Sequence, residues 1–263
     1  TLEAVFELRT DPRLNFNFQP RDNDRVPGYT AEMGDSYTLR DEIRSGWRIS
    51  EAINGIRRSS GAVWDSRKLS YVPMQRGSAT GSIWELEVAN GNYNIEIGFG
   101  DFGNTDHTNT FRLEDMLVVD PDGRDGFDTY SFENFKIEDG NLTITPEGSN
   151  VKISYLKIVP VGFDLHHFLA VANGTGEGEY ASGIQVPITA QTATGTDLFE
   201  WAGDTTYVDD FSSNETFVLM PNQDVQLRPS YISTYSLAVE NGTGTGNYRE
   251  GAVVNIEAET IEG

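Results

Sequence analysis

The part of this sequence best suited to bind a ligand is a basic, aromatic segment, residues 40–76. It holds eight Lys and Arg residues against four Asp and Glu, in a chain of 263 residues whose formal net charge is −22. The segment also contains Trp47, Trp64 and Tyr71. Flat aromatic rings stack on the apolar faces of sugar rings. We therefore expect these three rings to pack against a sugar.

The arginines of this segment suggest an anionic ligand. A guanidinium group binds a carboxylate or sulfate through two parallel hydrogen bonds. We expect Arg57, Arg58 and Arg67 to make such contacts. The alternative is that the tryptophans are core residues and that the arginines pair with the surplus acids of the chain.

Two further candidate groups follow in the sequence. Asp101 and His107, in GDFGNTDH, can bind a sugar hydroxyl or a cation, although ordinary turn chemistry explains them too. The run DPDGRDGFD places four acids close together, at positions 120, 122, 125 and 128. Its spacing departs from an EF-hand, since Arg124 and Ser131 stand where an EF-hand has ligands. The alternatives are a looser calcium site and a solvated turn.

The sequence offers little for catalysis. It has no cysteine, only three histidines, and neither a GxSxG nor an HExxH motif. The glycine-rich GTGEGE and GTGTGN runs do not match nucleotide-binding loops, because a strand rather than a helix is expected after them. We expect a non-catalytic protein with no catalytic residues.

The negative charge of the chain argues against nucleic acid and anionic membranes as partners. Residues 164–263 contain 15 acidic and 2 basic residues, and residues 1–163 contain 26 and 17. Such an acidic chain is not expected to bind nucleic acid or an anionic membrane surface. No apolar run is long enough to span a membrane as a helix.

The pattern of apolar residues predicts an all-β protein. Residues 84–88 and 93–99 alternate apolar and polar side chains on either side of Asn90-Gly91, which predicts a β-hairpin over residues 82–101. Shorter alternating runs predict strands at 4–8, 14–18, 110–113, 116–119, 130–137, 142–145 and 151–159. This number of strands favours an antiparallel jelly-roll β-sandwich.

The C-terminal part contains an internal repeat. LAVANGTGEGEYASGIQVPITA (169–190) matches LAVENGTGTGNYREGAVVNIEA (237–258) at an offset of 68 residues. The second copy stops about halfway, so we expect the natural polypeptide to continue. We predict three parts: a sandwich (1–161), a complete repeat (162–232) and an incomplete second repeat (233–263).

Particular runs of the first part resemble malectin-like, galactose-binding-type β-sandwich modules. These are NFQP (17–20), PGYTAEMGDSY (27–37), Gly46-Trp47, the WELEVANGNYNIEIGFGD run (84–101) and KISYLKIV (152–159). Modules of this kind are appended to secreted bacterial polysaccharide-degrading enzymes, and loops at one edge of the sandwich build their ligand site. The resemblance implies that segments 40–76 and 101–109 form that site.

Residues 164–231 resemble the divergent internalin-B-type bacterial repeat, a small β-grasp-like spacer. NGTGEGEY, the F-x-x-W-x-G-D run (199–204) and the MP-x-x-D-V run (220–225) carry this resemblance. Together the two resemblances imply a secreted, extracellular carbohydrate-binding module that is linked to a catalytic domain. The arginines of segment 40–76 favour an acidic, marine-type polysaccharide as its ligand. The alternative is a structural or adhesive module of a bacterial surface protein with no glycan ligand.

Overall fold

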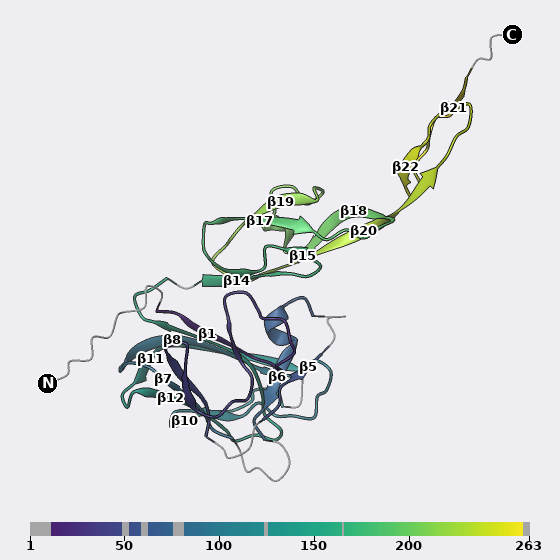
Figure 1. Cartoon of the computed structure of the whole chain (residues 1–263). Coiled ribbons are helices and arrows are strands. Elements are labelled where there is room, and N and C mark those ends of the chain that lie inside the picture. Colours follow the sequence, from purple (N-terminus) through teal and green to yellow (C-terminus); the bar gives the residue numbers. More distant parts are fainter. Residues whose placement is uncertain are drawn as a thin grey trace. The chain divides into compact units, whose positions relative to one another are not determined.

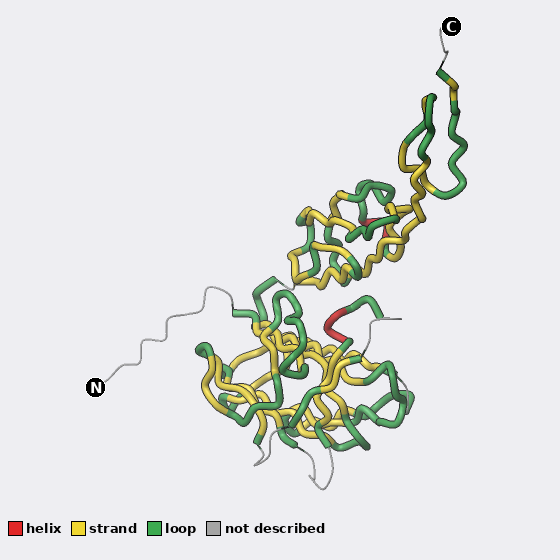
Figure 2. Tube along the Cα trace, turned by 45° about the vertical axis from the view of Figure 1, so that its right-hand side comes forward, coloured by secondary structure: helices red, strands yellow, loops and turns green. Residues whose placement is uncertain are grey.

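The computed structural model describes residues 12–48, 53–58, 63–75, 82–123, 126–164 and 166–259, and divides into two compact units, Thr1–Leu165 and His166–Gly263. Within the described residues, helix is confined to two 3₁₀ turns, η1 (Ser66–Lys68) and η2 (Thr205–Tyr207), as Figure 2 shows. The all-β prediction is therefore confirmed. Neither turn is long and apolar enough to cross a membrane. The strand predicted at 4–8 lies outside the described residues.

The first unit is a sandwich of two sheets (Figure 1). One sheet has the order β11 (Phe127–Ile137), β8 (Gly91–Gly100), β13 (Lys152–Pro160), β1 (Leu14–Phe18) and β2 (Thr30–Glu32). In the same sheet β6 (Ser70–Pro73) also pairs with β13, and β5 (Ile56–Arg57) pairs with β6. The other sheet has the order β10 (Met116–Val118), β9 (Phe111–Leu113), β12 (Asn141–Pro146), β7 (Trp84–Glu87), β4 (Ile43–Trp47) and β3 (Thr38–Arg40).

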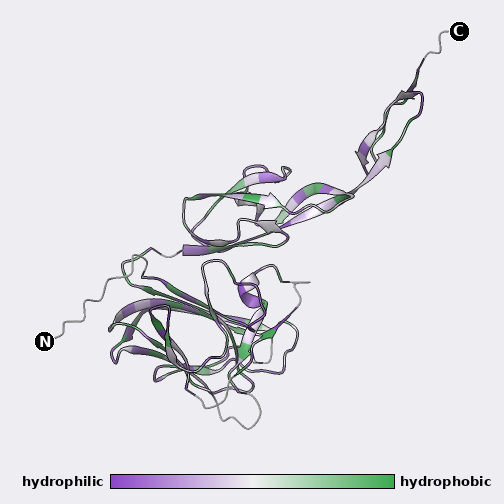
Figure 3. Cartoon of the chain, viewed as in Figure 1, coloured by the Kyte–Doolittle hydropathy of each residue, from purple (hydrophilic) through white to green (hydrophobic). Residues whose placement is uncertain are grey.

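Alternating side chains from both sheets fill the core between them. Tyr93, Ile95, Ile97 and Phe99 of β8 all belong to one buried cluster with residues of β7 and β12. Trp84 of this cluster is fully buried, and Phe16 and Phe18 both pack edge-on against its indole with ring centres 5.3 Å away. Figure 3 shows the hydropathy of the residues along the strands.

The hairpin predicted over residues 82–101 is wrong. β7 pairs with β4 and β12, whereas β8 pairs with β11 and β13 in the opposite sheet. The connection passes from one sheet to the other, with the Val88 amide bonded to Gly140 O and the Asn90 side chain to Glu138 O. Neither Asn90 nor Gly91 has the positive φ that a type I′ hairpin turn needs. Two strands that face each other across a core show the same alternation as a hairpin.

A buried polar layer covers the outer face of the β8 sheet. The Arg67 guanidinium is 2% exposed, bonds Asp65 through Nε (2.9 Å) and Nη2 (2.7 Å), and lies 4.6 Å from the centre of the Tyr155 ring. Tyr155 fits there because its neighbour on β8 is Gly98, which has no side chain. Asn17 links this layer to β13 by donating to Arg67 O and Ser154 O.

The second unit consists of short sheets around a core of its own. β14 (His166–Val171), β16 (Gly178–Ala181), β18 (Thr196–Gly203) and β20 (Val225–Leu237) form one sheet, and β22 (Gly246–Arg249) also pairs with β20. A second sheet holds β15 (Gly174–Thr175), β17 (Gln185–Ala190) and β19 (Glu215–Leu219). Trp201 is the largest side chain of the core between them.

The second copy of the repeat reproduces the strand pairing of the first. His166 pairs with Ala181 between β14 and β16, and 68 residues later Thr234 pairs with Arg249. Likewise Gly174 pairs with Ala190, and Gly242 pairs with Ala258 between β21 (Gly242–Thr243) and β23 (Glu257–Ala258). The first copy buries Ile188, whereas its counterpart Ile256 is 56% exposed.

Candidate functional site

Two of the aromatic residues that were predicted to bind a ligand are buried in the structure. Trp47 is 1% exposed and packs edge-on against Phe18 at 6.1 Å. Tyr71 is 2% exposed. The prediction that these rings stack on a sugar is wrong, because each ring lies inside the protein. For Trp47 the core alternative is correct.

Arg67 is not available to a ligand either. Its guanidinium is buried against Asp65 and Tyr155, and its Nη1 donates to the Tyr29 hydroxyl at 3.4 Å. Burial alone would lower the pKa of Arg67, but the charge and hydrogen bonding of Asp65, together with Tyr29 and Tyr155, hold that pKa well above its ordinary value. The sequence-based alternative, in which arginines pair with acids of the chain, holds for this residue.

Two more of the predicted residues of the basic segment lie nearer the surface. Arg57, at the end of β5, is exposed, and Trp64, just before η1, is half-buried. They remain candidates for contact with a ligand.

The structure brings four of the eight predicted residues into one polar cluster, which we call the Asp101 cluster. Arg58 Nε and Nη2 bond the two carboxylate oxygens of Asp101, at 2.7 Å for Nε, and Nη2 also donates to the Tyr71 hydroxyl at 3.1 Å. Lys152, on β13, lies 3.3 Å from Asp101 Oδ2 and 3.4 Å from His107 Nδ1. Asp101, His107 and Lys152 are buried, so this cluster anchors loop 101–110 rather than presenting these groups to solvent.

The electrostatics fit this structural role. Burial alone would raise the pKa of Asp101, but hydrogen bonds from Arg58, Tyr71 and the Gly103 amide and the charge of Lys152 hold that pKa well below its ordinary value. Burial and then the Lys152 charge lower the pKa of His107. Because a lysine ammonium only donates, His107 Nδ1 accepts and the ring proton sits on Nε2.

A stacked pair of aromatic rings, Phe102 exposed and Phe127 half-buried, lies beside this cluster. Phe102 is 46% exposed and stacks in parallel on Phe127, with ring centres 5.1 Å apart and planes 2° apart. Lys68 Nζ lies 5.1 Å from the centre of the Phe127 ring. We call Lys68, Phe102 and Phe127 the aromatic platform. Arg58 borders it, because a Cβ on Gly103 would lie 2.8 Å from Arg58 Nε.

The sequence analysis missed the platform residues. Phe102 stands in the GDFGN loop that was singled out for its polar residues, and an aromatic residue within a loop of glycines and polar residues was the available signal. Phe127 stands within the acidic run DPDGRDGFD, before the strand predicted at 130–137. Lys68 is the sequence neighbour of Arg67 in the basic segment. The two residues differ in burial, which the sequence does not show.

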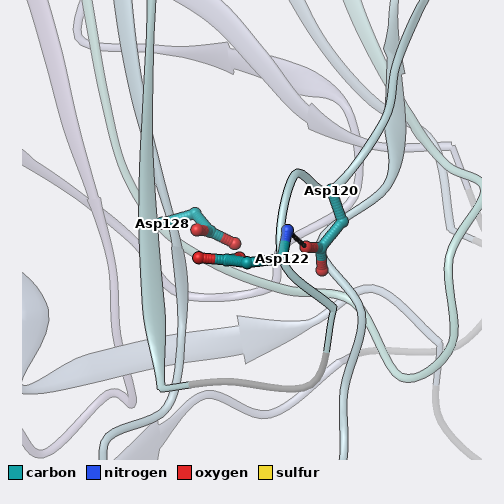
Figure 4. A group of neighbouring side chains, drawn as sticks. All are labelled: Asp120, Asp122 and Asp128. Atoms are coloured by element: carbon teal, nitrogen blue, oxygen red, sulfur yellow. Dashed lines mark hydrogen bonds between the residues drawn. The ribbon is translucent and has the colours of Figure 1, made fainter.

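Three carboxylates of the acidic run lie close together. Ligand oxygens of Asp120, Asp122 and Asp128 all lie within 4.8 Å of one another, and this cluster can hold a metal ion (Figure 4). Asp120 Oδ1 accepts from the amides of Asp122 and Gly123, which fixes the turn. Burial raises the pKa of Asp128, and the charges of the two other aspartates raise it further. Asp125 lies outside the described residues.

Residues 168–233 match the family described as Divergent InlB B-repeat domain. The match covers most of the repeat predicted at 162–232 and agrees with the sequence-based resemblance. No curated protein matches the chain.

Several solved structures are distantly similar. Protein YXIM of Bacillus subtilis is 22% identical, with a TM-score of 0.42 over 60% of this chain and 43% of that one. A calcium binding mutant of Bacteroides uniformis beta-glucuronidase 2 is 9% identical, with a TM-score of 0.39 over 57% and 18%. The glycoside hydrolase domain of Endo-D from Streptococcus pneumoniae R6 is 8% identical, with a TM-score of 0.27 over 82% and 37%. This chain therefore spans less than half the length of each.

Proposed function

We propose that the first unit is a non-catalytic carbohydrate-binding module of a secreted bacterial polysaccharide-degrading enzyme. The observation that carries this proposal is the aromatic platform: Phe102 keeps 46% of its surface exposed while Phe127 holds its ring in place. A pre-positioned ring binds a sugar face with little loss of conformational freedom. Lys68, and the exposed Arg57 on β5, suit the carboxylates or sulfates of an acidic polysaccharide.

The module would raise the local concentration of a linked catalytic domain on its polymer. The acidic second unit suits the role of a spacer, since its charge keeps it from adhering to anionic polymers. Calcium belongs to this proposal as the cofactor of the acidic cluster, because carboxylate oxygens are the ligands that this ion prefers.

Affinity electrophoresis of the full chain in gels containing alginate, a sulfated galactan or a neutral glucan tests the proposal. We expect retardation by an acidic polymer, and we expect Phe102→Ala to reduce the affinity about tenfold or more, as loss of one stacked ring typically does. Phe199→Ala is the matched control, because Phe199 is 53% exposed but lies in the second unit. A chain that no polymer retards would favour the structural or adhesive alternative.

A further inference from the structure

A polar cavity opens at the start of β1, beside the turn that leads into β2. Its lining comes from residues 13–15, residues 28–30 and Ile43 of β4, and its volume is about 320 Å³. This volume lies at the small end of the range for ligand sites in proteins, about 300–1,000 Å³. The cavity therefore suits one sugar ring rather than a longer oligosaccharide.

A tight turn forms one wall of the cavity. Gly28 has a φ of 80°, which a residue with a side chain rarely adopts, and the Tyr29 amide closes the turn by donating to Val26 O at 3.1 Å. The Asn15 side chain joins β1 to this turn by donating from Nδ2 to Gly28 O at 3.3 Å. Tyr29 is 7% exposed, and its hydroxyl accepts from Arg67 Nη1 at 3.4 Å. Contacts with β1 and with the buried polar layer therefore fix this wall before any ligand binds.

The residues that line the cavity match the groups of a uronic acid, a sugar that carries a carboxylate. Arg13 has five N–H donors, which can serve a carboxylate in addition to the contact that it makes within the protein. The Thr30 hydroxyl and the Asn15 amide both donate and accept hydrogen bonds, as sugar hydroxyls do. Leu14 and Ile43 add apolar surface for the C–H face of a sugar ring. We infer that this cavity binds a uronic acid residue of the polymer, as a second subsite separate from the aromatic platform.

The buried polar layer connects the cavity with the platform. The Arg67 guanidinium lies 4.6 Å from the centre of the Tyr155 ring, and that ring stacks on Phe127 with ring centres 6.3 Å apart. On β1, Asn15 is two residues, about 7 Å, from Asn17, which pairs with Tyr155. The two sites therefore lie within reach of one short stretch of polymer. The inference rests on the proposed function, and it narrows the acidic polymer to a polyuronate.

Nuclear magnetic resonance tests the cavity directly, without any polymer. In the ¹⁵N-labelled full chain, sodium glucuronate should shift the backbone amide signals of Asn15, Gly28 and Thr30 saturably, and glucose at the same concentration should shift them less. Signals that do not move with glucuronate, or that move equally with glucose, overturn the inference. This measurement needs no variant, so it does not depend on whether a substituted chain folds.

Two substitutions test the assigned side chains. Asn15→Asp places a negative charge in the cavity, and Thr30→Val removes a hydroxyl while it keeps the size of the side chain. Each should weaken glucuronate binding about tenfold, and urea unfolding checks that each variant folds. Thr38→Val, at an exposed threonine of β3, is the matched control and should leave the affinity unchanged. Native affinity in both cavity variants overturns the inference.

Oligomers separate failure of this inference from failure of the proposed function. In calorimetric titrations a mannuronate hexamer should bind the native chain about tenfold more tightly than the dimer, because only the hexamer reaches both sites, and Thr30→Val should remove most of this difference. Equal binding of dimer and hexamer overturns the second subsite, but it leaves the proposed function in place if Phe102→Ala still weakens binding. A chain whose amides respond to glucuronate but that binds no oligomer or polymer keeps the uronate cavity and loses the proposed function.

Discussion

Arg58 donates hydrogen bonds from Nε and Nη2 to the two carboxylate oxygens of Asp101. The guanidinium that was predicted to bind a ligand therefore binds another residue of the protein. The contact joins the end of the short strand β5 to the start of loop 101–110. Asp101 is buried on the inner side of this pair, and the Arg58 side chain is 38% exposed on the outer side. The pair therefore fixes the loop that carries Phe102.

Replacing Asp101 with Asn should destabilise the first unit at neutral pH. The substitution leaves Arg58 and the buried Lys152 without their shared carboxylate. Breaking a buried pair costs about 3–5 kcal/mol, and we expect about 2–3 kcal/mol here because Arg58 is partly exposed. The free energy of unfolding, measured by urea denaturation at pH 7, checks this value, with Asp115→Asn as the control.

The pH dependence of this effect has a definite sign. The pKa of Asp101 is lower in the folded chain than in the unfolded one, so its contribution is complete above the ordinary aspartate pKa of about 4 and is lost as pH falls through the folded pKa. The difference between native chain and Asp101→Asn should therefore shrink below about pH 4. A difference that is constant down to pH 2 contradicts this account.

His107 should make the first unit less stable in mild acid. Burial and the facing Lys152 lower its pKa, while Asp101, Asp106 and Asp128 act in the opposite direction. The unfolded chain then takes up a proton near pH 6.5 that the folded chain takes up only at lower pH, so stability falls as pH decreases below about 6.5. Unfolding of the native chain and of His107→Gln at pH 7.5 and pH 5 should show a larger loss in the native chain. Equal losses contradict it.

The sequence predicted most strands of the first unit because alternation reports a half-buried strand directly. The strand predicted at 14–18 coincides with β1, and that at 151–159 differs from β13 (Lys152–Pro160) by one residue at each end. Alternation does not say which strand is the neighbour. β7 and β8 therefore look like a hairpin although they belong to opposite sheets.

The site was harder to predict because residue type does not report burial. Arg67 and Lys68 are adjacent in the sequence, yet Arg67 is buried against the Tyr155 ring and Lys68 lies against the Phe127 ring. The segments 40–76 and 101–109 do meet, at Arg58 and Asp101, but as an anchor for the loop. Phe102, the exposed ring of that loop, was not predicted as a site residue because apolar residues are usually interpreted as core residues.

A methyl group added at Gly98 should disturb the layer over the β8 sheet. A Cβ there would lie 2.6 Å from Tyr155 Cδ1 and 2.9 Å from Phe127 Cζ. Overpacking of this kind costs about 1–3 kcal/mol, so Gly98→Ala should lower the free energy of unfolding by that amount. The displaced Phe127 ring should also weaken polymer binding in the electrophoretic assay.

Gly91, on the same strand, provides the control for Gly98. A Cβ at Gly91 would meet Tyr93 Cε2 at 3.7 Å, which is an ordinary contact. Gly91→Ala should therefore leave stability and retardation nearly unchanged. Equal effects of the two substitutions would show that loss of backbone freedom, rather than contact with Tyr155 and Phe127, determines the outcome.

The two units should respond separately to changes in their cores, because the buried clusters of the two units share no residue. Trp201 is 1% exposed, and its Nε1 donates to Ser213 O at 2.9 Å. Trp201→Ala removes that core side chain and should cost the second unit about 3–5 kcal/mol. Phe199→Ala, two residues away and 53% exposed, should change stability by about 0.5 kcal/mol or less. In calorimetry of the full chain only the transition of the second unit should move with Trp201→Ala; a parallel shift of the first unit would mean that both melt as one cooperative body.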